Sequence, residues 1–157
     1  MKSKNPKKFK ICVACSPGGH MVQARQLAEV YERYDYFYFT FASPVARELM
    51  KTAPVRTIPN ITKYKPLSWL TGFIRSGWII LKERPNLVIS TGAGVVLFLC
   101  LFAKLSGAKL IFLESMAKVE EPTLTGRLLY PFSDLFLVQW PRLLRFFPRA
   151  KYHGRLF

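Results

Sequence analysis

Short apolar runs rich in β-branched and aromatic residues recur along the chain, with segments of helical periodicity between them. Runs typical of buried strands lie at Phe9–Cys15, Tyr36–Phe41, Val55–Ile58, Leu87–Ser90, Leu110–Leu113 and Leu135–Gln139. The intervening segments predict helices at Met21–Arg33, Pro44–Lys51, Leu67–Arg84, Val95–Ser106 and Leu124–Tyr130. Continuous apolar strands are typical of sheets that are covered on both faces, and strand–helix alternation is typical of right-handed βαβ units. The pattern therefore predicts an α/β fold, a Rossmann-like doubly wound parallel sheet that binds ligands beyond the carboxyl ends of its strands.

A glycine turn, Ser16-Pro17-Gly18-Gly19-His20, joins the first predicted strand to the first predicted helix. The start of a helix leaves backbone N–H groups unpaired, and the helix dipole there favours negative charge. Gly18 and Gly19 allow a ligand to approach the backbone closely, and His20 can donate, accept or carry a proton. The turn indicates a phosphate site, while a tight connection with a polar helix start is the alternative.

A second glycine turn, Ser90-Thr91-Gly92-Ala93-Gly94, follows the fourth strand. Its backbone donors would lie on the same sheet edge, so the two turns together could hold a diphosphate. The fifth strand ends at Glu114-Ser115 on that edge. Glu114 could bind a sugar hydroxyl or act as a base, or it could be a salt-bridged carboxylate at the end of a strand.

The segment Leu67–Leu81 carries apolar residues on more than one helical face and is flanked by basic residues. Tryptophan beside lysine and arginine is typical of helices that lie at a membrane interface. Trp69, Phe73 and Trp78 are therefore candidate membrane contacts, and a core helix with buried tryptophans is the alternative.

Composition narrows the choice of partners. The chain has 157 residues, of which 50% are hydrophobic and 15% aromatic, and a formal net charge of +15. This fits one folded domain, residues 9–157, behind a basic tail at residues 1–8, and the charge indicates anionic partners. No nucleic-acid-binding motif accompanies the charge, so nucleic acid is not predicted as a partner. The first turn lacks a complete G-x-G-x-x-G pattern and no acid follows the second strand, which disfavours a dinucleotide enzyme.

The three cysteines predict neither a disulfide framework nor a metal site. Cys12 and Cys15 point to opposite faces of one strand, and Cys100 falls in a predicted buried helix, so all three are interpreted as core residues. The residues predict no cofactor.

Five segments together resemble the Alg14 family, which includes bacterial capsule and exopolysaccharide subunits of the PssD type. They are the Ser-x-Gly-Gly-His turn, Ile89–Gly94, Lys109–Ser115, Pro122–Asp134 and Val138–Pro141. The resemblance covers nearly the whole chain. It implies the N-terminal half of a split GT-B glycosyltransferase, whose nucleotide-sugar half is a separate Alg13-like or PssE-like subunit. Eukaryotic members carry an N-terminal membrane helix where this chain has Met1–Lys8, so the resemblance implies a peripheral protein on the cytoplasmic face of the membrane.

The function implied is one subunit of an inverting UDP-sugar transferase, using UDP-N-acetylglucosamine or a related donor, in lipid-linked oligosaccharide or polysaccharide biosynthesis. The chain would bind a polyprenyl-diphosphate-linked sugar at the membrane and be inactive alone, since 157 residues leave no room for a second Rossmann domain. A non-catalytic membrane adaptor is the alternative. The candidate catalytic residues are His20 and Glu114. The candidate acceptor-binding residues are Ser16, Gly18, Gly19, His20, Thr91, Gly92, Gly94 and Ser115.

Overall fold

The computed structural model describes residues 9–61 and 66–156, and the basic tail predicted at residues 1–8 lies outside them. Within the described ranges, seven strands form one parallel sheet in the order β3-β2-β1-β4-β5-β6-β7. The strands are β1 (Lys10–Ala14), β2 (Asp35–Phe41), β3 (Val55–Ile58), β4 (Leu87–Ser90), β5 (Lys109–Leu113), β6 (Leu135–Val138) and β7 (Lys151–Tyr152). The predicted fold class is confirmed.

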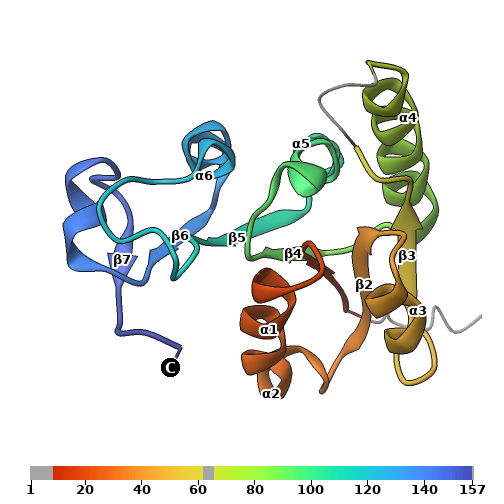
Figure 1. Ribbon diagram of the computed structural model, residues 1–157, viewed down its shortest axis with the longest axis horizontal. Helices are drawn as coiled ribbons and strands as arrows, with labels where there is room; N and C mark the ends of the chain where they lie inside the picture. The colour runs from red at the N-terminus through yellow and green to blue at the C-terminus, as the bar shows by residue number, and fades with distance from the viewer. Residues whose placement is uncertain (1–8, 62–65, 157) are drawn as a thin grey trace, which may run out of the picture.

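Helices cover both faces of this sheet, with α4, α5 and α6 on one side and α1 and α2 on the other (Figure 1). The α-helices are α1 (Gly19–Gln26), α2 (Ala28–Tyr31), α3 (Pro44–Leu49), α4 (Pro66–Glu83), α5 (Leu97–Leu105) and α6 (Leu124–Leu129). Short 3₁₀ helices are η1 (Gly94–Val96), η2 (Tyr130–Phe132) and η3 (Pro141–Arg145). In the described ranges, no helix combines the length and apolar character needed to cross a bilayer.

The alternation of β1 shows why the sheet needs both layers. Cys12 and Ala14 pack into the core beneath α4–α6, whereas Ile11 and Val13 pack into the core above α1 and α2. All four side chains are at most 1% exposed. A strand buried on both faces requires an unbroken apolar sequence, which is the pattern that predicted it.

The three cysteines are core residues, as predicted. Cys12, Cys15 and Cys100 are fully buried and unpaired. Burial raises the pKa of the Cys15 thiol to about 12, and burial likewise raises that of Cys100 to about 12 despite a hydrogen bond with Ser90. Such thiols stay protonated and behave as small apolar side chains.

Two features differ from the prediction. The expected helix Met21–Arg33 breaks at Leu27, whose ψ of 11° departs from α-helical geometry and whose N–H bonds the carbonyl of Ala24 three residues earlier. The strand β7 was not predicted, because two exposed residues, Lys151 and Tyr152, carry no apolar pattern.

Ion pairs and hydrogen bonds tie elements together at the amino ends of the strands. Asp134 precedes β6, and its carboxylate accepts hydrogen bonds from Lys104 Nζ at 2.6 Å, the Leu110 N–H at 2.8 Å and Lys109 Nζ at 3.1 Å. Partial burial alone would raise the pKa of Asp134, but these donors outweigh it and hold the pKa well below its usual range. Asp134 thereby links α5, β5 and β6.

Candidate functional site

The two glycine turns lie side by side because β1 and β4 are neighbours in the sheet. Ala14 at the end of β1 pairs with Ser90 at the end of β4. From β1 the chain runs to β2 and β3 on one side, while β4, β5, β6 and β7 lie on the other. This is the point where the strand order reverses, and open α/β sheets bind their ligands in the crevice there.

His20 and Thr91 join the two turns through a reciprocal pair of hydrogen bonds. The His20 Nδ1 lies 2.6 Å from the Thr91 carbonyl oxygen, and the Thr91 hydroxyl donates to the His20 carbonyl at 2.8 Å. Because a carbonyl oxygen only accepts, Nδ1 must carry the proton in this contact. The remaining nitrogen, Nε2, is then a base when the ring is neutral and a second donor when it is charged.

The glycines of the turns differ in what they contribute. Gly18 has a φ of 91° and Gly92 a φ of 99°, a backbone conformation that favours glycine. A Cβ added at Gly18, Gly19 or Gly94 would meet no atom within 4 Å, so the backbone there borders open space. The Gly92 N–H donates to Ser90 Oγ at 3.2 Å and is engaged within its own turn.

The start of α1 has the features of an anion site. Its N-cap residue is Gly18, no side chain caps it, and its first turn contains no acidic residue. The N–H groups of the first turn therefore have neither a capping carboxylate nor a capping hydroxyl, and the helix dipole favours an anion in that place.

A pocket of about 330 Å³ adjoins both turns and the first turns of α4. It is lined by Ser16, Phe41, Asn60, Ile61, Trp69, Ala93, Gly94 and Val95. Trp69 was predicted as a membrane contact, and it also forms a wall of this pocket. Phe41, Asn60 and Ile61 were not predicted as site residues, because only the packing of β2 and the segment after β3 against α4 brings them here.

Glu114 is buried beneath the segment that leads to α6. Its carboxylate accepts hydrogen bonds from the Ser115 N–H at 2.8 Å, the Thr123 N–H at 3.3 Å and the Thr123 hydroxyl at 3.1 Å. Gly126 leaves the room that the carboxylate occupies. In the described part of the chain, the Glu114 carboxylate accepts hydrogen bonds from residues 115 and 123 and from no residue of either glycine turn. The geometry favours bracing of the loop over contact with a substrate, and the salt bridge that the sequence offered as the alternative is not formed among the described residues.

Ser115 is also largely buried, at 6% exposure. Its hydroxyl accepts a hydrogen bond from the Ala117 N–H at 3.3 Å. Ser115 therefore stabilises the same loop, and its predicted role in binding an acceptor remains a prediction.

Gln23 and Gln139 form a buried link that sequence reasoning missed. The Gln139 Nε2 donates to Gln23 Oε1 and to the Glu114 carbonyl oxygen, each at 3.0 Å, and its Oε1 accepts from the Leu156 N–H at 3.2 Å. Gln23 lies three residues after His20, on the buried face of α1. A polar residue on an otherwise apolar helix face was the available signal. The link fixes α1 against the ends of β5 and β6.

The predicted membrane residues of α4 are partly exposed. Trp69, Phe73 and Trp78 are 40%, 46% and 57% exposed. Phe73 also packs on Phe98 and Phe102 of α5, with ring centroids 5.4 Å and 4.8 Å apart. Phe73 lies seven residues before the buried Ile80 and so on the same side of the helix, which fits the core interpretation there, whereas Trp78 lies on the exposed side.

The family described as "Oligosaccharide biosynthesis protein Alg14 like" matches residues 40–156. The chain belongs to the Alg14 family. The matched range includes the second glycine turn and Glu114, while the first turn precedes it.

Curated Alg14 relatives are named as subunits of a UDP-N-acetylglucosamine transferase. The chain is 34% identical over 119 residues to subunit ALG14 of Yarrowia lipolytica, covering 68% of this chain and 55% of the relative. It is 32% identical over 153 residues to that of Candida glabrata, covering 85% of this chain and 60% of the relative. It is 29% identical over 125 residues to that of Homo sapiens, covering 76% and 54%. The chain thus spans little more than half the length of these relatives.

Solved structures support the fold expected of an Alg14-family chain. MurG of Acinetobacter baumannii is similar with a TM-score of 0.72 at 15% identity, over 85% of this chain and 42% of MurG. UDP-N-acetylglucosamine 2-epimerase of Rickettsia bellii gives a TM-score of 0.75 at 10% identity, over 95% of this chain and 45% of the epimerase. At these identities the likeness concerns the fold, and it confirms a Rossmann-like domain equivalent to one half of a GT-B enzyme.

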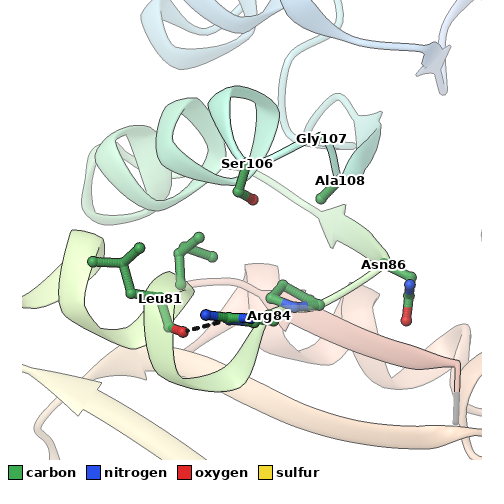
Figure 2. A pocket seen from close by; sticks show the side chains of 8 residues that line it. Leu81, Arg84, Asn86, Ser106, Gly107 and Ala108 are labelled. Carbon is green, nitrogen blue, oxygen red and sulfur yellow. Dashed lines mark hydrogen bonds between the residues drawn. The ribbon is translucent and has the colours of Figure 1, made fainter. Parts of the chain in front are cut away.

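A further hollow lies at the opposite edge of the sheet from the glycine turns, between the ends of α4 and α5 (Figure 2). Arg84 Nε donates to the Leu81 carbonyl there, at 3.2 Å. Ser106, Gly107 and Ala108 line its other side. Ligands of open α/β sheets bind at the carboxyl edge, so this hollow is separate from the candidate site of the Alg14-family chain.

Proposed function

We propose that this chain is the acceptor-binding subunit of a two-component, inverting UDP-sugar transferase. The observation that carries the proposal is the pairing of two glycine turns at the carboxyl ends of β1 and β4, with open space beside Gly18, Gly19 and Gly94. A diphosphate would lie on the unpaired N–H groups at the start of α1. The adjoining pocket, with Trp69 as a wall, suits the less polar parts of a polyprenyl-diphosphate-linked sugar.

His20 is the candidate for direct contact with the acceptor. With Nδ1 held by the Thr91 carbonyl, Nε2 would contact the diphosphate as a donor or assist proton transfer as a base. Glu114 would act as a positioning residue that braces the loop before α6. The nucleotide-sugar half would come from an Alg13-like or PssE-like partner, and the active pair would work as a peripheral complex on the cytoplasmic face of the membrane. The chain alone would then show no transfer.

Gly19→Leu tests the acceptor site in the complex reconstituted with the partner. Gly19 has no neighbour within 4 Å of an added Cβ and no positive φ, so the variant should fold while its side chain fills the space assigned to the diphosphate. We expect transfer to fall at least roughly tenfold with complex formation unchanged. Gln26→Leu places the same side chain on an exposed position at the other end of α1 and is the matched control.

The alternative is an adaptor that only anchors and activates the partner. An adaptor would tolerate Gly19→Leu, so unchanged transfer would favour it. Robust transfer by the chain without a partner would contradict both functions.

A further inference from the structure

A groove of about 420 Å³ runs between α4 and the edge strand β3. It is lined by Arg56, Thr57, Ile74, Arg75, Trp78 and Ile79. Most of this lining is apolar, and the groove shares no residue with the pocket beside the glycine turns. The groove is therefore a separate hollow from the candidate acceptor site.

The two arginines of the groove differ in how far their charges are balanced. Arg56 Nε donates to Glu83 Oε1 at 2.6 Å, and Glu83 also receives Lys10 Nζ at 3.0 Å. Arg75 is exposed, and no acidic side chain in the described part of the chain pairs with it. Lys82 adds a further positive charge, with its Nζ 4.8 Å from the Trp78 ring centroid. The groove is thus net positive at its exposed side, where Arg75 can pair with an anion.

The apolar lining of the groove continues onto the exposed surface of α4. Ile74 and Trp78 belong to a stripe with helical spacing, and they are 58% and 57% exposed. The other members of the stripe are Leu67, Leu70 and Leu81, at 68%, 53% and 70% exposed. A ligand that satisfies this site must pair an anionic group with an apolar body.

We propose that the groove binds one molecule of anionic phospholipid. Its phosphate pairs with the Arg75 guanidinium, and its glycerol and upper acyl segments lie against the Trp78 indole and Ile74. A free phosphate would leave the apolar walls in water, and a neutral apolar ligand would leave Arg75 unpaired. Only an anionic amphiphile meets both requirements.

Short-chain lipids below their micelle concentration test the site on the full chain. The probe is dihexanoylphosphatidylglycerol, and the readout is the indole N–H resonance of Trp78 in NMR, assigned with Trp78→Phe. We expect a saturable shift of that resonance. Dihexanoylphosphatidylcholine should bind at least roughly fivefold more weakly, because it lacks the net negative charge, and inorganic phosphate should give no saturable shift.

Three variants at basic positions distinguish specific binding at Arg75 from nonspecific attraction of an anionic lipid to the basic surface. Arg75→Gln should weaken binding of the phosphatidylglycerol at least roughly fivefold, and Arg75→Lys should restore part of it. Arg84→Gln removes the same charge immediately after the end of the same helix, outside the groove, and should bind as the parent does. Thermal melting confirms that each variant is folded.

Equal affinity for the two lipids, or equal losses in Arg75→Gln and Arg84→Gln, would contradict the proposal. Saturable binding of inorganic phosphate as tight as that of the lipid would mean a phosphate site and would equally overturn it. The titration uses the chain without its partner and without an acceptor. Its outcome is therefore separate from that of the transferase proposal.

Discussion

The imidazole of His20 has one nitrogen engaged with backbone, and this determines what the other can do. Nδ1 donates to Thr91, and among the described residues no hydrogen bond involves Nε2. A histidine held in this way has a defined tautomer and a defined direction for its second nitrogen. Two substitutions can therefore separate the two nitrogens.

His20→Asn retains a donor near the position of Nδ1 but has nothing in place of Nε2. If Nε2 acts on the acceptor, turnover of the reconstituted pair should fall roughly a hundredfold in His20→Asn, as in His20→Ala. His20→Gln can supply a donor near Nε2 and should retain more activity if the role is diphosphate contact. Parent-like kcat and KM in His20→Asn would mean that His20 only joins the two turns.

Glu114→Gln tests the bracing role at the residue level. The amide keeps one accepting oxygen and turns an NH₂ toward the N–H groups of Ser115 or Thr123, which leaves a buried donor without an acceptor. We expect a loss of about 1 to 3 kcal/mol in the free energy of unfolding, measured by urea denaturation. The exposed Glu121→Gln is the control and should unfold as the parent does.

The sequence predicted that His20 and Glu114 follow strand ends at one edge of the sheet, but not the direction of their side chains. Position at a strand end was enough to place His20 near Thr91, because parallel strands end on one edge. The burial of Glu114 depends on Thr123 and Gly126, which approach only after the chain has folded over the sheet. No local pattern encodes such a contact.

At the scale of elements, α4 presents different chemistry to its two sides. Its inner side packs on the sheet through Ile79 and Ile80, and Gly77 lies against the Phe102 ring of α5. Its outer side carries the exposed stripe. The sequence left an interface helix and a core helix as alternatives for this segment, because its apolar residues cover more than one helical face. The buried inner side fits the core alternative, and membrane contact by the outer side stays a prediction.

Leu70→Ser combined with Leu81→Ser tests the exposed stripe of α4 without changing a residue that lines the groove between α4 and β3. Both side chains are more than half exposed, so the fold should be preserved while apolar burial in a bilayer is lost. We expect weaker sedimentation with anionic vesicles and a steeper dependence on salt, because mainly charge attraction remains. Val22→Ser with Val30→Ser changes exposed residues on the opposite face and should have no effect, whereas equal losses in both double variants would contradict this orientation.

Apolar runs in the sequence predict buried strands but not short, exposed ones. Six strands were predicted because each is an apolar run, and β7 was missed because its two residues, Lys151 and Tyr152, are exposed and carry no apolar pattern. Met21, Ala24 and Tyr31 have helical spacing, and all three are buried although the helix breaks at Leu27. Apolar periodicity therefore indicates which residues are buried, but not whether the hydrogen bonds of the helix are continuous.

For the whole molecule, the formal charge of +15 makes the few carboxylates important for stability. The pKa of Asp134 is lowered in the folded protein, as is that of Glu83, where burial is outweighed by hydrogen bonds from Arg56 and Lys10. A lowered folded pKa gives stability that is present above the unfolded pKa, roughly 4, and is lost as the pH falls through the folded value. The protein should therefore lose stability below about pH 4.

Asp134→Asn should lower the free energy of unfolding at pH 7 by about 1 to 3 kcal/mol, because charge-assisted hydrogen bonds to α5 and β5 are weakened. The variant should also show a shallower loss of stability between about pH 4 and pH 2, since one titrating group is gone. Urea denaturation across this range measures both effects. Asp35→Asn, which removes only a 3.8 Å contact with Lys10, is the control, and an unchanged pH slope in Asp134→Asn would contradict the assignment.

The buried amide link has a consequence for the order in which the protein can mature during synthesis. Gln23 leaves the ribosome early, but its partner Gln139 lies 116 positions later, and Leu156 later still. A nascent chain arrested before β6 can form β1 and α1, yet its Gln23 amide has no acceptor or donor in place, and α1 is unanchored on that side. The helix that follows the glycine–histidine turn is thus linked to the carboxyl ends of β5 and β6 only after the last strands of the sheet have been made.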